Sequence, residues 1–253
     1  MTTSTGCATP LSNVARAVDV VDGAPCHIID HALADADLAR LGAAVDATRL
    51  LGHSQLVGGF AATRGFGIAC HHNALDDALQ KAPFLRAFVD LALQPTLRAL
   101  IRPPSVVDRL GSLLFHDINA LYLNVLSVPP GACVQRHTDA TLGTVVDDDR
   151  ALVPRVVVAL YVAVPHDLQG GVLRLFRGVD EAPIAEIEPR VGRLVAFDGR
   201  LAHEVTATTA SGPRISCVAE LYRLPRTRLR RLPRIRLQSN GFADVLQRVQ
   251  GSR

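Results

Sequence analysis

The segment Glu188–Tyr222 decides the fold, and it reads EPRVGRLVAFDGRLAHEVTATTASGPRISCVAELY. Its apolar runs are short and rich in Val, Leu and Ala, and Gly, Asp, Ser and Pro separate them. Runs of this kind are typical of β-strands joined by turns. His203 stands at the head of one run, and Arg214 opens the next one eleven residues later. We therefore expect a strand, a turn and a return strand that bring the arginine back beside the histidine.

The same pattern continues upstream, whereas the first half of the chain is different. Apolar positions after Asp35, and again from Asn73 to Ile101, recur at helical spacing, and the glycine-rich stretch Val57–Cys70 between them reads as irregular. We predict an α+β fold with a mainly β core, a double-stranded β-helix (jelly roll) flanked by N-terminal helices. Its further expected strands are Leu121–Val128, Cys133–His137, Arg155–Val164 and Val172–Phe176.

Composition excludes several classes of protein. Of the 253 residues, 48% are hydrophobic and 20% charged, too apolar for a disordered chain. We expect a single domain over residues 1–253, with a helical support region at about 25–105, a jelly-roll core at about 106–223 and an Arg-rich C-terminal segment at 224–253. The longest apolar runs are about 10 residues, half of what a membrane helix needs, so no membrane partner is expected.

Cysteine and charge patterns bear on compartment and partners. The five cysteines are scattered without a CxxC pair, and Met1–Ser12 lacks the features of a secretory signal, so we expect a cytoplasmic protein without a disulfide framework. The net charge of +3 indicates no nucleic-acid partner. The seven arginines within Tyr222–Arg236 could contact an anion or a partner, although a solvated edge with salt bridges is the favoured reading. The oligomeric state is open.

A candidate metal site comes from three residues. In His137-Thr138-Asp139 the first and third side chains of a strand would point the same way and could reach one ion. His203 is the third candidate ligand. Two histidines and one carboxylate leave three positions of an octahedral ion open, which is the pattern of non-heme Fe(II) oxygenases, whereas zinc favours a closed tetrahedral set.

Arg214 and Ser216 form a second candidate site. The guanidinium presents a fixed fork of donors that suits a carboxylate, and Ser216, two residues on, faces the same side and can donate another hydrogen bond. The pair would anchor a dicarboxylate near the metal. Asn124 and Tyr122, on the strand that leads to His137, are further candidates for cosubstrate contacts, although a structural role is equally compatible with their positions.

These motifs resemble the prolyl-4-hydroxylase-like branch of the Fe(II)/2-oxoglutarate-dependent oxygenases over about residues 119–223. Glu188–Tyr222 is similar to its glycine-and-phenylalanine strand, distal histidine and Arg-x-Ser sequence; Ala159–Phe176 to its tyrosine strand and Gly-Gly hairpin; and Leu121–Asp139 to its HxD stretch. The resemblance implies Fe(II) on His137, Asp139 and His203, 2-oxoglutarate on Arg214, O2 as co-reactant and ascorbate as a candidate reductant. It implies a hydroxylase that converts 2-oxoglutarate to succinate.

Departures from the family pattern bear on the substrate. Val134 and Val128 replace frequent aromatic residues, and Leu173 replaces a frequent threonine, which argues against collagen-type substrates. Asp139 argues against halogenation, since halogenases of this superfamily carry a small residue there. We expect a small-molecule substrate such as an amino acid or a natural-product intermediate. The alternatives are a peptidyl or carrier-bound residue, a cupin-like metal-binding protein, which Arg214 argues against, and nucleic-acid dealkylation, which the low net charge argues against.

Overall fold

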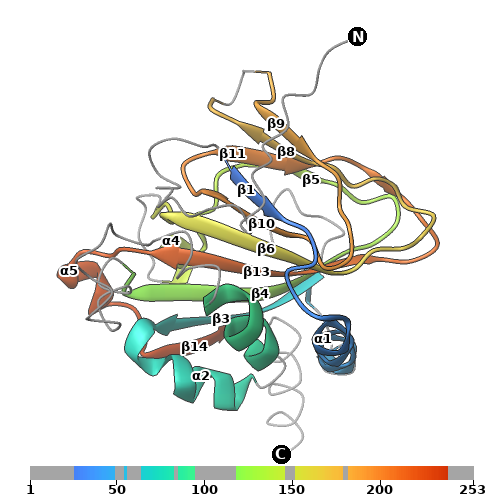
Figure 1. The fold of residues 1–253 in the computed structure, drawn as a ribbon. Coiled ribbons are helices and arrows are strands. Elements are labelled where there is room, and N and C mark those ends of the chain that lie inside the picture. The colour runs from blue at the N-terminus through green and yellow to red at the C-terminus, as the bar shows by residue number, and fades with distance from the viewer. Residues whose placement is uncertain are drawn as a thin grey trace, which may run out of the picture.

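The computed structural model describes residues 26–48, 54–55, 64–82, 85–94, 118–145, 152–178 and 182–238. Two β-sheets face each other, and the N-terminal helices cover the outer face of the larger one (Figure 1). The larger, major sheet has eight strands in the order β1-β10-β6-β13-β4-β3-β14, with β2 also paired to β3. Its strands are β1 (Cys26–Ile29), β2 (Ser54–Gln55), β3 (Arg64–His71), β4 (Ala120–Val128), β6 (Val156–Ala163), β10 (Leu194–Asp198), β13 (Arg214–Tyr222) and β14 (Ile235–Gln238).

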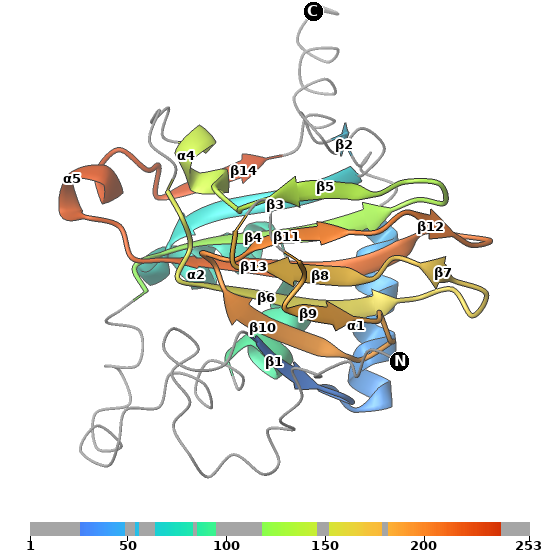
Figure 2. The ribbon, with the colours of Figure 1, turned by 90° about the horizontal axis from the view of Figure 1, so that it is seen from above.

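The minor sheet lies over the major one, as the view from above shows (Figure 2). It has four strands in the order β5-β11-β8-β9, and a further two-stranded ribbon pairs β12 with β7. All pairings in the described part of the chain are antiparallel, although most paired strands, such as β5 and β11, are far apart in the sequence. These strands are β5 (Val134–His137), β7 (Gln169–Gly170), β8 (Leu173–Phe176), β9 (Ala185–Ile187), β11 (Ala202–Val205) and β12 (Thr208–Thr209).

Alternation along the strands creates two apolar layers. Odd positions of β4 and β13, such as Leu121, Leu123 and Cys217, pack with Leu41, Phe88 and the other buried helical residues. The interior between the sheets holds a second cluster, which includes Tyr161, Leu175 and Phe197. The helical elements are α1 (Asp35–Thr48), η3 (His72–Ala74), α2 (Leu75–Lys81), η5 (Phe88–Leu93), α4 (Thr141–Val145) and α5 (Arg226–Leu229).

The predicted mainly β fold with N-terminal helices is confirmed, and every expected strand of the second half is present. Irregular structure for Val57–Cys70 is wrong in its second part, because Arg64–His71 forms β3 and pairs along the whole of its length with β4. Residues 57–63 lie outside the described residues, as do 95–101 of the expected second helix. Periodicity failed for β3 because its glycines obscure the apolar pattern of a strand.

The Arg-rich segment is folded against the body of the protein. After β13 the chain forms α5 and then β14, which pairs with β3 at the edge of the major sheet. Arg234 forms an ion pair of 2.9 Å with Asp77 of α2. This contact agrees with the favoured interpretation of an exposed edge with salt bridges. A β-strand in this segment was not predicted.

Two remaining sequence expectations concern cysteines and membranes. Among the described cysteines, Cys70, Cys133 and Cys217 are free and Cys26 is disulfide-bonded. None of the described helices is long and apolar enough to cross a bilayer.

Candidate active site

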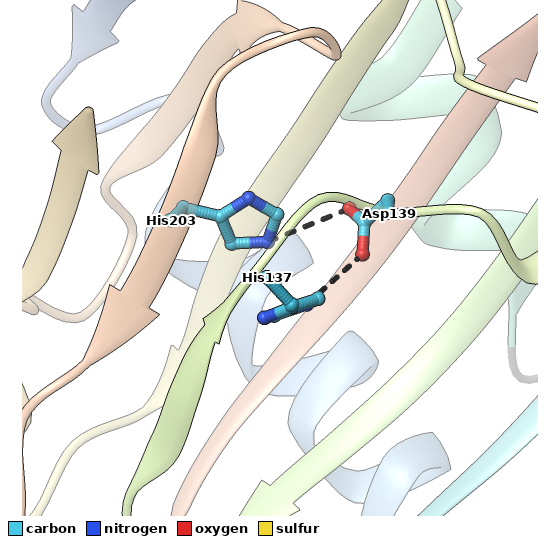
Figure 3. A group of neighbouring side chains, drawn as sticks. All are labelled: His137, Asp139 and His203. Carbon is cyan, nitrogen blue, oxygen red and sulfur yellow. Dashed lines mark ion pairs between the residues drawn. The ribbon is translucent and has the colours of Figure 1, made fainter. Parts of the chain in front are cut away.

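His137, Asp139 and His203 come together at one end of the interior (Figure 3). His137 ends β5 and His203 lies on β11, and the two residues pair directly across the minor sheet. His137 Nε2 lies 3.3 Å from Asp139 Oδ1, and His203 Nε2 lies 3.6 Å from Asp139 Oδ2. Ligands about 2.1 Å from one ion at right angles lie roughly 3 Å apart, so three donors at these separations fit a single metal ion.

Asp139 reaches the site by a route that differs from the prediction. The strand β5 ends at His137, and Asp139 lies in the loop that leads into α4. Strand alternation was therefore the wrong reason for placing the two side chains together. The conclusion that they can share one ion still holds, because the loop turns the carboxylate back toward both imidazoles.

Backbone carbonyls orient both histidines. His137 Nδ1 lies 2.8 Å from the Gln135 carbonyl oxygen, and His203 Nδ1 lies 3.3 Å from that of Leu201. Because a carbonyl can only accept, each Nδ1 must donate, so each Nε2 lies on the side of Asp139 and can bind a metal ion once it carries no proton. Histidine ligands of metals are held in this way by a second hydrogen bond. Phe197 also packs edge-on against the His203 ring, 5.1 Å between centroids.

The shifted pKa values of His203 and Asp139 favour the protonation states that bind a cation. Burial lowers the pKa of His203, which keeps its imidazole neutral. Burial acts to raise the pKa of Asp139, but His203 and His137 outweigh it and the net pKa is lowered. For His137, burial is outweighed by Asp139 and the pKa is raised, so metal binding at neutral pH displaces a proton from this ring.

Arg214 is a buried cation on the interior side of the major sheet, with only 3% of its surface exposed. Its Nη1 donates to the Gly171 carbonyl oxygen at 3.1 Å, and its guanidinium carbon lies 5.2 Å from the ring centroid of Tyr161. Its Nε has no hydrogen-bond partner, and no carboxylate of the described chain forms an ion pair with it. Burial lowers its pKa, and an unpaired buried charge is costly, so the site is suited to an anionic ligand.

The Gly170-Gly171 turn places the carbonyl that Arg214 contacts. Both glycines have positive φ, +73° and +68°, in the left-handed region that residues with a Cβ rarely adopt. A Cβ on Gly170 would also overlap the Ala207 carbonyl oxygen. The hairpin that the sequence identified thus shapes the wall of the anion site.

Ser216, Asn124 and Tyr122 all face the interior, since their strand neighbours Cys217, Leu123 and Leu121 pack against the helices. Ser216 is 2% exposed and follows Arg214 on the same face of β13. Asn124 is 6% exposed, and its Oδ1 has no hydrogen-bond partner. Burial, Glu220 and Asp139 raise the pKa of Tyr122, and its hydroxyl lies close to Gly67 of β3. All four predicted cosubstrate residues therefore lie on the interior face of two neighbouring strands.

Sequence reasoning missed Glu220, which also faces this interior. It is 4% exposed and sits opposite Tyr122 in the pairing of β13 with β4. Thr141 Oγ1 donates to its Oε1 at 2.7 Å, and the Tyr222 hydroxyl donates to its Oε2. Alternation from Arg214 through Ser216 could have revealed it, since every second residue of this strand points inward.

Gly67 was also missed, and its role is steric. The Tyr122 ring lies over Gly67 on the neighbouring strand, and a Cβ there would overlap the phenol hydroxyl. The local sequence does not predict this close contact between Tyr122 and Gly67, because it depends on the register between β3 and β4.

Two side chains that the sequence left open lie away from the metal ligands. His71 Nε2 lies 2.9 Å from the Leu232 carbonyl oxygen, so it ties β3 to the C-terminal segment. Arg174 pairs with Glu186 at 2.7 Å and approaches Glu204 at 3.6 Å across the minor sheet. These side chains are partly exposed, as expected for the outer face.

Comparison with known proteins agrees with this geometry. Residues 123–220 match the profile of the 2OG-Fe(II) oxygenase superfamily, in which 2OG denotes 2-oxoglutarate. That segment contains all three metal ligands, together with Arg214 and Ser216. No curated protein sequence matches the chain.

Solved structures share the fold at low sequence identity. A prolyl-4-hydroxylase from Pseudomonas putida is 24% identical with a TM-score of 0.53, and the match covers 83% of this chain and 98% of that one. A prolyl hydroxylase from Trichoplax adhaerens, solved with a hypoxia inducible factor peptide fragment, is 17% identical with a TM-score of 0.55 and coverages of 82% and 87%. The carbocyclase SnoK from nogalamycin biosynthesis is 14% identical with a TM-score of 0.57 and coverages of 85% and 86%.

Proposed function

Because this chain is a 2OG-Fe(II) oxygenase with a His-Asp-His triad, we propose that it hydroxylates an unactivated C–H bond of a small molecule, such as an amino acid or a natural-product intermediate. One observation carries the oxygenase chemistry. The three side chains that can bind Fe(II) share one interior with Arg214, a buried arginine that forms no ion pair with a carboxylate of the described chain. With Fe(II) and 2-oxoglutarate bound there, O2 would be the oxidant: one oxygen atom would enter succinate as 2-oxoglutarate loses CO2, and the other would enter the hydroxyl group of the product.

Each residue of the site has a distinct task in this proposal. His137, Asp139 and His203 would hold Fe(II), with both imidazoles fixed by their Nδ1–H bonds. Arg214 and Ser216 would hold the distal carboxylate of 2-oxoglutarate, which meets the unsatisfied guanidinium. Asn124 and Tyr122 face the same interior and would contact the end of the cosubstrate nearer the metal. Burial of these groups also keeps bulk water from the oxidising centre.

A small substrate is supported by the placement of the unmet polar groups. Asn124 is 6% exposed and faces the interior, where its Oδ1 has no hydrogen-bond partner, so a partner for it must enter the interior. A hydroxylated peptidyl or carrier-bound residue is the second candidate, because two solved structures of the same fold are titled prolyl hydroxylases. The replacement of aromatic residues by Val128 and Val134 favours the first candidate.

The test is an anaerobic titration of the metal-free protein with Fe(II) and then 2-oxoglutarate. A visible charge-transfer band is expected, absent in His137→Ala and weakened in Arg214→Ala. A wild-type protein that binds both and shows no band would contradict the proposed chemistry. Succinate release in air, compared across free amino acids, other small metabolites and proline-containing peptides, then separates the two substrate classes.

A further inference from the structure

Glu220 is an ionisable group that the oxygenase chemistry does not use. It projects from β13 into the interior, since its neighbours Ala219 and Leu221 pack on the helical side of the sheet. Burial and, after it, the Asp139 charge raise its pKa, and its Oε1 accepts a hydrogen bond from Thr141, two residues after Asp139. The residue therefore belongs to the wall around the reacting centre.

The Glu220 carboxylate retains hydrogen-bonding capacity. Thr141 donates to one oxygen and Tyr222 to the other, so each oxygen accepts one bond. A carboxylate offers about four lone-pair sites, which leaves room for about two further donors. No arginine, lysine or histidine within the described ranges pairs with it, and none contributes to its pKa.

Charge balance in the assembled site isolates Glu220. The two positive charges of Fe(II) and the one of Arg214 offset the Asp139 carboxylate and the two carboxylates of 2-oxoglutarate. The buried Glu220 carboxyl then has no counter-charge, and burial together with the Asp139 charge raises its pKa to about 8, so it holds a proton near neutral pH. A buried carboxyl ionises only when a cation pairs with it, so a cationic ligand would bind here as Glu220 releases its proton.

We propose that Glu220 binds a protonated nitrogen of the substrate, so that the oxygenase acts on amine-bearing small molecules. This inference rests on the proposed function and specifies its substrate class. An ammonium would donate to the free lone pairs of Oε1 and Oε2, and Tyr122, opposite Glu220 on β4, would line the same subsite. The carboxylate would thereby orient the carbon chain of the substrate toward the metal ligands.

The alternative is a purely structural role, in which Glu220 only anchors the Asp139 loop through its hydrogen bond with Thr141. Glu220→Gln separates the two roles, because the glutamine carbonyl still accepts from Thr141 and the amide can still bond to the Tyr222 hydroxyl. The substitution keeps the shape and the hydrogen bonds, and removes the charge. Tyr222→Phe is the complementary variant, since it keeps the charge and removes one bond.

The experiment measures binding of n-butylammonium and of its neutral counterpart butan-1-ol. Calorimetric titration is done anaerobically at pH 7 on the Fe(II)- and 2-oxoglutarate-loaded protein. The amine is protonated at this pH, so it offers almost no lone pair to iron. The wild type should bind the ammonium about 10- to 100-fold more tightly than the alcohol, and Glu220→Gln should bind both alike.

Control variants decide how the result is read. Glu186→Gln removes a carboxylate from the outer face of the minor sheet and should leave the ammonium preference intact, as should Tyr222→Phe. A wild type without preference, or a Glu220→Gln protein that keeps it, would overturn the inference. So would loss of the preference in Tyr222→Phe, since anchoring would then explain both variants. If Glu220→Gln fails to fold, the wild-type comparison and Tyr222→Phe still decide.

The charge-transfer band of the same samples keeps two failures apart. A missing band in the wild type counts against the proposed oxygenase site. A normal band without ammonium preference counts against Glu220 alone, and leaves the oxygenase chemistry in place.

Discussion

The two sheets that face the interior differ in how completely their polar groups are satisfied. The minor sheet and the loop after it supply His137, Asp139 and His203, whose unused atoms are tied to backbone carbonyls or to one another. The major sheet supplies Arg214 and Asn124, which keep buried atoms without hydrogen-bond partners, and Glu220, a buried carboxyl with a raised pKa. The side chains of the minor sheet are thus already arranged for metal binding, whereas those of the major sheet have polar groups that small molecules would satisfy.

The largest effect should follow from breaking the satisfied wall. His203→Ala removes one of three metal donors, and we expect succinate formation to fall by more than about 100-fold together with loss of the charge-transfer band. His166→Ala, which removes an exposed turn histidine, is the matched control and should behave as wild type. Retention of the band in His203→Ala would contradict the assignment of the ligand.

Arg214→Met tests the unsatisfied wall and should act in two directions. The KM for 2-oxoglutarate should rise about 100-fold, because the distal carboxylate loses its charged partner. The metal-free and cosubstrate-free protein should unfold in urea with equal or higher stability, by up to about 1–3 kcal/mol, because the variant no longer buries an unpaired charge. An unchanged KM would show that 2-oxoglutarate binds elsewhere.

Gly67→Ala tests the close packing of Tyr122 against β3 in the major sheet. The added methyl group would overlap the Tyr122 hydroxyl, so the ring must move, and we expect a loss of about 1–3 kcal/mol in the free energy of unfolding. Gly42→Ala is the control, since its Cβ would meet only Val162 Cγ1 at 3.9 Å and helical alanine is favoured over glycine. Equal stabilities of the two variants, measured by urea unfolding, would refute the close packing of Tyr122 on β3.

Glu220 makes the stability of the metal-free protein depend on pH. Burial and Asp139 raise its pKa to about 8, so the folded chain holds a proton that the unfolded chain releases near pH 4.3. The associated stability is complete below the unfolded pKa and is lost as pH rises through about 8. Glu220→Gln should therefore gain about 4 kcal/mol on the wild type between pH 5 and pH 8.5 in urea unfolding. A constant difference across this range would contradict the raised pKa.

The smallest effect is expected on the outer face. Glu186→Gln breaks the exposed Arg174–Glu186 pair, and the free energy of unfolding should change by less than about 0.5 kcal/mol. A thermal melt with and without added salt checks this expectation. A much larger loss would mean that the outer charge network supports the sheet that carries the metal ligands.

Much of this site follows from local patterns. Apolar runs with turn residues identified the strands of the jelly roll, and the types and order of His137, Asp139, His203 and Arg214 identified the metal and anion sites. Local patterns did not predict β3 and β14, because glycines in β3 and arginines around β14 obscure the alternation of a strand. These strands exist because the edge of the major sheet pairs with them, which is a long-range effect.

By itself, the sequence determined the kinds of chemistry available, because donor types and strand alternation are local properties. Only the tertiary structure decided which groups are satisfied. The bond from Thr141 to Glu220 joins residues 79 positions apart, and the fit of Tyr122 over Gly67 depends on strand register. Burial between two sheets leaves Arg214 as an unpaired charge and raises the pKa of Glu220, since a charge needs a partner only once water is removed.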